Sequence, residues 1–591
     1  MTNTESSPPP APPPLRASLQ QFVDEFVAYS GRSGVFAVGA VAAGAVLEAL
    51  SLAILVPLLS VALGTDLPLG GLGRATTALF HRLGIETPVA RLALLLGIFG
   101  LLFALRAIVL SIRDVSVAKL QTGFVEAQRL RLAEQLVGAQ WDQIVRLRHA
   151  RITHLMSGEI QRVGDMTQII LRSVVLSVML AAQFVLVLLL APLFASLAFA
   201  LLLVGALALL PVARRAHAFG RLMGNANLAL LNSTAQFLGG LKLAMSQNLQ
   251  SGFLSEFRQS LRELTERQVD YRRQDSRMRN ALSILSALAA ALLVLLGFAV
   301  FHLETATLVA VVLIIARMIA PMGQIQQDVQ LFLNYLPSYE RAKDFEREFA
   351  ALPRQQSDKS IRAPLPEGPI GFAHVTYRYT ADDGGAIRGI EDVSLTIAPG
   401  EFIGITGPSG AGKTTFADLL VGLFSPQHGE ITVGGVRLQG GNLALWRDTI
   451  GYVSQDPFLF HDTVRHNISW ANPQASERDI WEALTLMGAD GIVRGMQSGL
   501  DTIVGERGAL MSGGERQRIA LARGILRKPR LLILDEATNA IDVAGERKIL
   551  DVLRDLPYRP AIVIIAHRTE SLARCQRIFR FDAGRCIEEN A

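Results

Sequence analysis

Residues 407–415 read GPSGAGKTT, which places glycines, a lysine and hydroxyl groups at a spacing suited to phosphate binding. Glycines in such a loop let backbone N–H groups converge on phosphate oxygens with no Cβ in the way. We expect Lys413 to reach the β- and γ-phosphates and Thr414 to place its hydroxyl on Mg²⁺. A predicted strand at 401–406 and a predicted helix at 416–420 flank the loop, and the start of that helix favours anions. The expected phosphate-binding residues are Gly407, Ser409, Gly410, Gly412, Lys413, Thr414 and Thr415.

The apolar run 531–534 ends in two consecutive carboxylates, Asp535 and Glu536. A buried strand that ends in this way suits Asp535 to hold Mg²⁺ through water and Glu536 to polarise an attacking water. Two acids at a strand end could instead cap a helix. The phosphate-binding loop in the same domain favours the hydrolytic interpretation.

The chain of 591 residues is too long for one domain, and its two halves differ in kind. The first half contains six apolar segments long enough to cross a bilayer, which takes roughly 20 residues. The boundary between the third and fourth segments, near 191–193, is the least distinct. The six predicted spans are 34–63, 90–112, 169–190, 193–212, 281–302 and 305–332.

The distribution of Lys and Arg predicts the orientation of these spans. Segments 113–168 and 213–280 carry eight and eleven of them, whereas 64–89 carries two and 303–304 none. We therefore expect both termini and both long connections to be cytoplasmic. The net charge of +5 could suggest nucleic acid as a partner, but the basic residues cluster beside apolar runs, which favours membrane lipid and no nucleic acid.

Composition also predicts the domain boundaries. Residues 1–16 are proline-rich and read as a disordered tail, and 17–335 form a transmembrane domain with two long cytoplasmic loops. Residues 336–368 read as a linker, and 369–591 as a nucleotide-binding domain. Within the second region, 19–29 could be an interfacial helix or a solvent-exposed helix that leads into the first span.

Ionisable residues inside spans are costly and suggest function. Glu48, Arg106 and Arg317 are the candidates, with Gln183 as a neutral polar companion. A cavity lined by the two arginines would favour a substrate with an anionic group. In the alternative interpretation Glu48 neutralises one arginine as an internal structural pair, and apolar side chains line the cavity.

Residues 511–518, MSGGERQR, resemble the signature sequence of the ATP-binding-cassette (ABC) family. The resemblance implies that Ser512, Gly513 and Gly514 meet the γ-phosphate of ATP bound to another cassette. The family usually has Leu at the first position and Gln at the fifth, so Met511 and Glu515 are mild departures that could alter the hydrolysis rate.

Further family elements can be placed by position. Tyr379 matches the aromatic residue that stacks on adenine, Gln455 the glutamine that senses Mg²⁺, and His567 the histidine that contacts the γ-phosphate. Asp542, in the sequence NAID, is similar to the aspartate of the loop that crosses the dimer interface. Segment 502–508 resembles a stretch typical of exporters, where it senses the intracellular loops.

The resemblance covers about residue 18 to the end of the chain and implies a half-transporter of the exporter type. The expected fold is an all-α six-helix transmembrane domain followed by an α/β phosphate-loop ATPase domain with a helical subdomain. ATP and Mg²⁺ are the implied cofactors. The composite ATP site implies a dimer, and the intact motifs favour a homodimer over a heterodimer with one degenerate site.

The implied function is ATP-driven transport by alternating access in the inner membrane of a bacterium. We expect an exporter or flippase for an amphiphilic substrate such as a peptide, a lipid or a lipid-linked glycan. Segments 141–148 and 237–245 are the expected contacts between the helices and the cassettes. The alternatives are an importer of metal–siderophore complexes with exporter-like spans and, from another class, an ATP-gated regulatory or channel protein.

Overall fold

The structure is a computed structural model. It describes residues 15–63, 71–85, 87–146, 149–190, 192, 196, 210–299, 305–350, 365–379 and 389–589. The chain divides into two compact units, 1–137 with 147–351, and 138–146 with 352–591. Most of the predicted tail and of the fourth span, and residues 351–364 of the predicted linker, lie outside the described residues. The predicted order of a helical part followed by an α/β part is confirmed.

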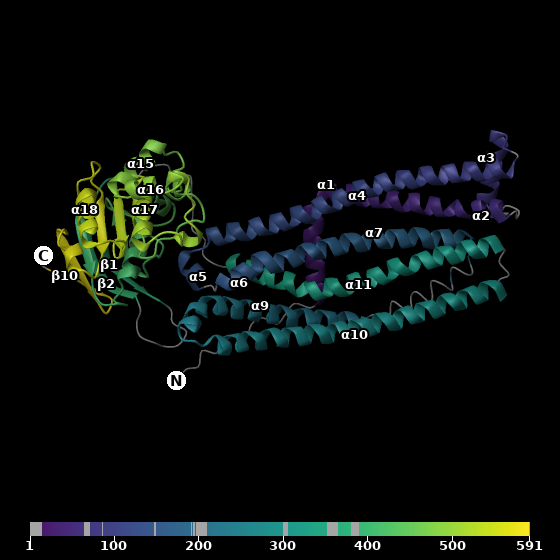
Figure 1. Ribbon diagram of the computed structural model, residues 1–591, viewed down its shortest axis with the longest axis horizontal. Coiled ribbons are helices and arrows are strands. Elements are labelled where there is room, and N and C mark those ends of the chain that lie inside the picture. Colours follow the sequence, from purple (N-terminus) through teal and green to yellow (C-terminus); the bar gives the residue numbers. More distant parts are fainter. Residues whose placement is uncertain are drawn as a thin grey trace. The chain divides into compact units, whose positions relative to one another are not determined.

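Unit 1 is helical throughout its described residues (Figure 1). Its longest helices exceed the span of a bilayer, so they continue beyond the apolar segments, as the sequence indicates for the connections. Helix α11 packs against both α7 and α9, and α1 packs against α7. The helices are α1 (Leu15–Ala53), α2 (Leu55–Leu63), α3 (Gly71–Leu83), α4 (Pro88–Gly138), α6 (His149–His154), the π-helix η1 (Leu155–Glu159), α7 (Ile160–Leu190), α9 (Leu210–Ser246), α10 (Gln250–Ala299) and α11 (Thr305–Ala350).

Three helices in the described part of the chain are long and apolar enough to cross a membrane, namely Leu15–Ala62, Pro88–Gly138 and Arg151–Leu189. They contain the first three predicted spans. The predicted fifth and sixth spans fall on α10 and α11, so the number of spans stays a prediction. Residues 336–350, at the start of the predicted linker, continue α11 as helix, and the charge-rich sequence 339–349 also predicts a helix there.

Helix α1 changes direction at Gly31, where φ is 45° and ψ is −130° (Figure 1). The segment before this kink was predicted to lie on the membrane surface or in solvent. Phe22 is instead fully buried and makes edge-to-face contacts with Phe124, Phe332 and Tyr339. Val27, in the same segment, is 59% exposed. The first segment of α1 is therefore packed against α4 and α11 within unit 1.

Glu48 lies at the centre of the ionisable residues predicted inside the spans. Its Oε2 is 3.1 Å from Nη2 of Arg106 and its Oε1 is 3.1 Å from Nη2 of Arg317. The Gln183 amide also donates to Glu48, over 3.4 Å. One carboxylate thus joins α1, α4, α7 and α11, and the arrangement favours the structural pair over a cavity lined by both arginines.

Two further ion pairs tie α11 to its neighbours in unit 1. Nε of Arg172 lies 2.9 Å from Oδ2 of Asp328, which is fully buried. Arg341 donates two hydrogen bonds of 3.0 Å to Glu159, at the end of η1. Each arginine donates two hydrogen bonds to a buried carboxylate, so losing either cation would weaken the neutralisation of a buried charge.

Unit 2 contains two sheets. The first is antiparallel, in the order β2-β1-β4-β5, and the second has the order β10-β9-β3-β8-β7-β6. In the second sheet β3, β6, β7, β8 and β9 run parallel to their neighbours, and β10 pairs antiparallel with β9. The strands are β1 (Ile370–Arg378), β2 (Gly389–Ile397), β3 (Phe402–Thr406), β4 (His428–Val433), β5 (Val436–Arg437), β6 (Ile450–Val453), β7 (Leu531–Asp535), β8 (Ala561–Ile565), β9 (Arg577–Asp582) and β10 (Arg585–Glu589).

Helices complete unit 2. Strands β7 and β8 are buried along their full length, as expected for parallel strands covered on both faces. Ser476 and Ser512 begin α15 and α17 with reciprocal capping boxes, and Asp542 caps α18. The helices are α5 (Trp141–Arg146), α12 (Lys413–Val421), α13 (Gly441–Arg447), α14 (Val464–Ser469), α15 (Glu477–Leu486), α16 (Asp490–Gly495), the 3₁₀ helices η2 (Gly499–Asp501) and η3 (Glu506–Gly508), α17 (Gly513–Ile525), α18 (Val543–Arg554) and α19 (Thr569–Leu572).

The packing of α1 can be tested at Phe22. Phe22→Ala removes a fully buried ring with three aromatic neighbours, a change that typically costs about 3–5 kcal/mol. We expect the thermal unfolding midpoint of the protein in nanodiscs to fall by several degrees. Phe36→Ala, on the same helix but 60% exposed, is the matched control. Equal midpoints for the two variants would contradict this packing.

Candidate functional site

The candidate nucleotide site lies at one edge of the six-stranded sheet. Strands β3, β8, β7 and β6 are parallel neighbours, so their carboxyl ends meet at the same edge. The phosphate loop follows β3, and His567 follows β8 after one residue. Asp535 ends β7 and Glu536 comes next, while Gln455 lies two residues beyond β6. Residues far apart in the sequence are thereby placed together.

The phosphate loop closes around the ammonium of Lys413. Its Nζ donates to the carbonyl oxygens of Gly407, at 2.7 Å, and of Pro408, at 3.0 Å. Burial lowers the pKa of Lys413, while the negative charges of Glu536 and Asp535 oppose that change. Gly407 has φ of 141°, and a Cβ there would lie 2.1 Å from the Phe581 carbonyl oxygen. The backbone can therefore follow this path only with glycine at 407.

Helix α12 begins directly at Lys413 after Gly412, whose φ of 108° also favours glycine. The start of α12 supplies free backbone N–H groups and the positive end of a helix dipole. Thr414 is exposed and Thr415 is buried. The Thr415 hydroxyl lies 3.2 Å from the Tyr379 hydroxyl, so the expected adenine-stacking residue sits beside the phosphate loop.

Three side chains hold the carboxylate of Glu536. Its Oε2 accepts from Nε2 of Gln455 at 2.9 Å and from Nδ2 of Asn539 at 2.8 Å. Its Oε1 lies 2.9 Å from Nε2 of His567. Glu536 also has φ of 50°, an uncommon conformation for a residue other than glycine. The carboxylate is thus fixed in position next to the loop that carries Lys413.

A second acidic group occupies the interior of this edge. The Tyr452 hydroxyl donates to Oδ2 of Asp535 at 3.2 Å. Burial raises the pKa of Asp535, and this hydrogen bond opposes the rise. Burial also raises the pKa of Asp418, on α12, to about 7, and the charge of Asp535 adds to that effect. The site therefore concentrates acidic groups where a bound cation would relieve their repulsion.

The expected signature residues form a separate group around Ala540. Gly513 and Gly514 face it so closely that a Cβ on either would lie 3.1 or 3.0 Å from an Ala540 atom. Ser512 caps α17 together with Glu515, whose carboxylate accepts from the Ser512 N–H at 2.8 Å. Glu515, a departure from the family pattern, is therefore a capping residue here.

The structure places some of the predicted site residues at one edge of the sheet and others elsewhere. Lys413, Gln455, Asp535, Glu536 and His567 share one edge of the sheet. In the described part of the chain, no hydrogen bond or ion pair joins Ser512 or Asp542 to the phosphate loop. Asp542 instead caps α18 by accepting from the Gly545 N–H at 3.1 Å.

Sequence reasoning missed three residues of this site, namely Asn539, Tyr452 and Asp418. The sequence did mark Asn539 as unusual, because it stands where the similar family loop has serine. In the structure its longer amide side chain reaches Glu536. Asp418 had a weaker signal, as an acid inside an otherwise apolar predicted helix. Tyr452 had none, since a tyrosine in a buried strand is ordinary.

Comparisons with known proteins bear on this geometry. The sequence model of the ABC transporter family matches residues 390–539. A solved bacterial Atm1-family ABC exporter with ATP bound superposes with a TM-score of 0.75 at 22% identity, over 94% of both chains. Residues 390–539 therefore match the ABC transporter family, and the chain has the fold of an ABC exporter. Its second unit is accordingly an ABC-type ATPase domain that binds nucleotide, and its apolar helices belong to a membrane-embedded protein.

Two curated relatives are similar to this chain over shorter stretches. The heterocyst differentiation ATP-binding protein HepA of Nostoc sp. is 34% identical over 50% of this chain. The ATP-dependent lipid A-core flippase of Burkholderia pseudomallei is 41% identical over 38% of it. The matched stretches span 48% and 37% of these relatives, so the chain covers about half or less of their length.

The role of Asn539 can be tested by Asn539→Ala. Glu536 would lose one of the two amide donors on Oε2 but keep Gln455 and His567. A hydrogen bond to a charged group contributes about 1.5–3 kcal/mol, and with partial compensation we expect kcat for ATP to fall about three- to tenfold. The dissociation constant for ATP should stay unchanged. Asn442→Ala, at a side chain distant from these contacts, is the control, and an unaltered kcat in Asn539→Ala would refute the positioning role.

The pKa of Asp418 predicts a pH effect on stability. Because this pKa is raised from 3.8 to about 7 on folding, the folded state holds the proton more tightly. The stabilisation is full below about pH 4 and is lost as the pH rises through about 7. Asp418→Asn should therefore gain thermal stability relative to the wild type between pH 5.5 and pH 8.5, measured without Mg²⁺ and nucleotide. A difference between the two proteins that does not change with pH would contradict the raised pKa.

Proposed function

We propose that this chain is half of an ATP-driven transporter, an exporter or flippase that moves an amphiphilic substrate out of the cytoplasm by alternating access. The observation that carries the proposal is the fixed carboxylate of Glu536 beside the phosphate loop, in a chain that also supplies helices of bilayer length. A site equipped for hydrolysis and joined to membrane helices can convert ATP turnover into movement of those helices.

The proposed roles follow from the contacts. The loop 407–415 holds the phosphates, with Lys413 on the β- and γ-phosphates. Asp535, Thr414 and Gln455 fit Mg²⁺, which takes one or two carboxylates and completes its shell with phosphate oxygens and water. No cluster of three or more His, Cys, Asp or Glu side chains suited to a metal occurs among the described residues, as this mode of binding requires none. Glu536 polarises the attacking water, and His567 contacts the γ-phosphate.

A dimer is part of the proposal. Ser512, Gly513 and Gly514 surround the start of α17, a helix whose positive end suits a γ-phosphate. Since Ser512 has no hydrogen bond to the phosphate loop among the described residues, a second copy would supply the loop that this signature meets. Two copies then form two equivalent sites. Asp542, which ends the loop containing Ala540, would lie at the same interface.

We propose that the surface of unit 2 around segment 502–508 couples ATP turnover to the membrane helices. The segment 502–508 runs beside 462–464 through a bridge between Thr463 and Ile503. Ile503, Phe458 and Trp470 are 53%, 54% and 59% exposed, which is unusual for large apolar side chains. Helix α5 lies within the expected coupling segment 141–148, and the second expected segment, 237–245, lies within α9. We propose that these two segments dock on the cassettes.

The substrate class and the membrane are proposed on weaker support. The lipid A-core flippase of Burkholderia pseudomallei acts, by its name, on a lipid, which is compatible with an amphiphilic substrate here. The apolar segments support six spans, and the charge distribution of the connections supports both termini being cytoplasmic. The resemblance to bacterial exporters supports the inner membrane of a bacterium. Import of metal–siderophore complexes and ATP-gated regulation remain the competing functions.

The proposal can be tested with Glu536→Gln in sealed vesicles. The variant keeps the shape of the side chain but loses its negative charge, so we expect ATP turnover to fall at least about a hundredfold while ATP still binds. ATP-dependent movement of a labelled lipid, a peptide or a ferric siderophore should stop in parallel, and the direction of movement distinguishes export from import.

The control is Glu482→Gln, a carboxylate on α15 that takes no part in the site. Its turnover and transport should equal those of the wild type. Transport that continues in Glu536→Gln without turnover would refute a pump and favour an ATP-gated channel. The absence of turnover in the wild type would refute the ATPase assignment of Glu536.

A further inference from the structure

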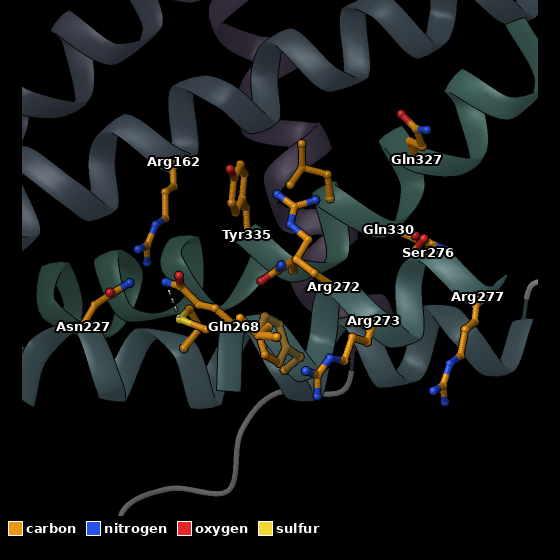
Figure 2. A pocket seen from close by; sticks show the side chains of 16 residues that line it. Arg162, Asn227, Gln268, Arg272, Arg273, Ser276, Arg277, Gln327, Gln330 and Tyr335 are labelled. Atoms are coloured by element: carbon orange, nitrogen blue, oxygen red, sulfur yellow. Dashed lines mark hydrogen bonds between the residues drawn. The ribbon is translucent and has the colours of Figure 1, made fainter. Parts of the chain in front are cut away.

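A cavity of about 1000 Å³ lies in unit 1 between α7, α9, α10 and α11 (Figure 2). Its size falls in the range of small-molecule sites. Four of the described residues that line it are arginines, and none is acidic. The arginines are Arg162 on α7 and Arg272, Arg273 and Arg277 on α10.

The positive charge of this pocket is only partly neutralised. Arg162 lies 3.7 Å from Glu159, but that carboxylate already accepts two hydrogen bonds from Arg341. Arg273 pairs with Asp270 at 3.3 Å, and both side chains are 68% exposed. Neither Arg272 nor Arg277 has an ion pair within the residues that the structure describes. The pocket therefore retains cationic groups able to bind an anion.

Arg162 and Arg272 are better placed for such an anion than the other two arginines. They come from α7 and α10 and lie on either side of Tyr335, which projects from α11 (Figure 2). Arg273 and Arg277 lie farther along α10 and point away from Tyr335 (Figure 2). Guanidinium groups bind carboxylate and phosphate through paired hydrogen bonds, so two of them around one space suit an oxyanion.

Gln330 provides an independent sign of a ligand. Its side chain lines the pocket and is 7% exposed, and its Nε2 has no hydrogen-bond partner among the described residues. A buried donor without an acceptor is costly and rare in folded proteins. An oxyanion bound in the pocket would supply the acceptor that the described part of the chain does not provide.

Part of the pocket wall is apolar. Phe219 and Met223 on α9 and Leu331 on α11 contribute ring, thioether and aliphatic surface. A free inorganic anion would make no apolar contact with this wall. A molecule with both an oxyanion and an apolar portion would match both kinds of wall.

We propose that this pocket binds the phosphate or carboxylate group of an amphiphilic anion, with Arg272, Arg162 and Gln330 as its polar contacts. The inference rests on the proposed transport function and specifies the chemistry of its substrate. The sequence suggested Arg106 and Arg317 as an anion site, but both pair with Glu48. The proposed site instead uses arginines that are not all neutralised.

The test measures binding of radiolabelled oleoyl lysophosphatidic acid to the full chain in phosphatidylcholine nanodiscs without nucleotide, with empty nanodiscs subtracted. Oleoyl lysophosphatidylcholine has the same tail but a zwitterionic headgroup, and glycerol 3-phosphate has the phosphate without the tail. We expect saturable binding of lysophosphatidic acid and at least about tenfold weaker competition by each of the other two, since each lacks one half of the recognised chemistry.

Variants assign the binding to the pocket. Arg272→Gln should raise the dissociation constant about tenfold, and Arg272→Lys, which keeps the charge, should raise it less. Gln330→Leu should weaken binding several-fold without lowering the thermal midpoint, because it removes a donor that has no partner among the described residues. Arg262→Gln, at an exposed arginine of α10 outside the pocket, is the matched control.

Equal affinities for the two lysolipids, or equal effects of Arg272→Gln and Arg262→Gln, would overturn the proposal. Glycerol 3-phosphate binding as tightly as lysophosphatidic acid would overturn the amphiphilic part and leave a site for small phosphorylated molecules. ATP turnover is measured on the same nanodiscs. Turnover that depends on Glu536 without lysophosphatidic acid binding would reject the pocket alone, whereas absent turnover would reject the proposed pump.

Discussion

Parallel pairing of β3, β8, β7 and β6 is the constraint on which the nucleotide site depends. The pairing brings the carboxyl ends of four strands to one edge, although the residues beyond them are up to about 160 positions apart. The end of β3 contributes the phosphate loop and the end of β8 an imidazole. The end of β7 contributes two carboxylates, and the end of β6 an amide. Because β7 and β8 are buried along their full length, their register is strongly specified, and a shift in it would displace the groups at their ends.

In unit 1, ion pairs bring distant parts of the sequence together. An unpaired charge among apolar helices is expensive, so each buried carboxylate determines which helices must lie together. Glu48 pairs with arginines on α4 and α11. Asp328 pairs with Arg172 on α7, and Glu159 pairs with Arg341 on α11. Helix α11 takes part in all three groups. It is therefore the helix through which a change in one part of unit 1 would reach the others.

The sequence predicted the order of the two folds and the edge of the sheet at which chemistry occurs, because local motifs and buried strands carry that information. It left open whether Glu48 pairs with an arginine or the arginines line a cavity, because such contacts depend on how distant helices rotate and pack. The same limit explains the pocket. Arg162 and Arg272 were counted only as signals of membrane orientation, and no local pattern reveals that they share a cavity with Gln330. Likewise, Phe22 was assigned to a surface helix because its three aromatic partners lie more than 100 residues away along the chain.

The position of the cationic pocket has a consequence for coupling. A ligand can shift a conformational equilibrium only by binding two states with different affinity. The pocket walls come from four separate helices, so any movement of α10 relative to α7 alters the separation of Arg272 and Arg162. An oxyanion held by both guanidinium groups would be sensitive to that separation, because paired hydrogen bonds require defined geometry. A substrate bound here would thus favour one arrangement of α7, α10 and α11, and the arrangement that separates the arginines would release it.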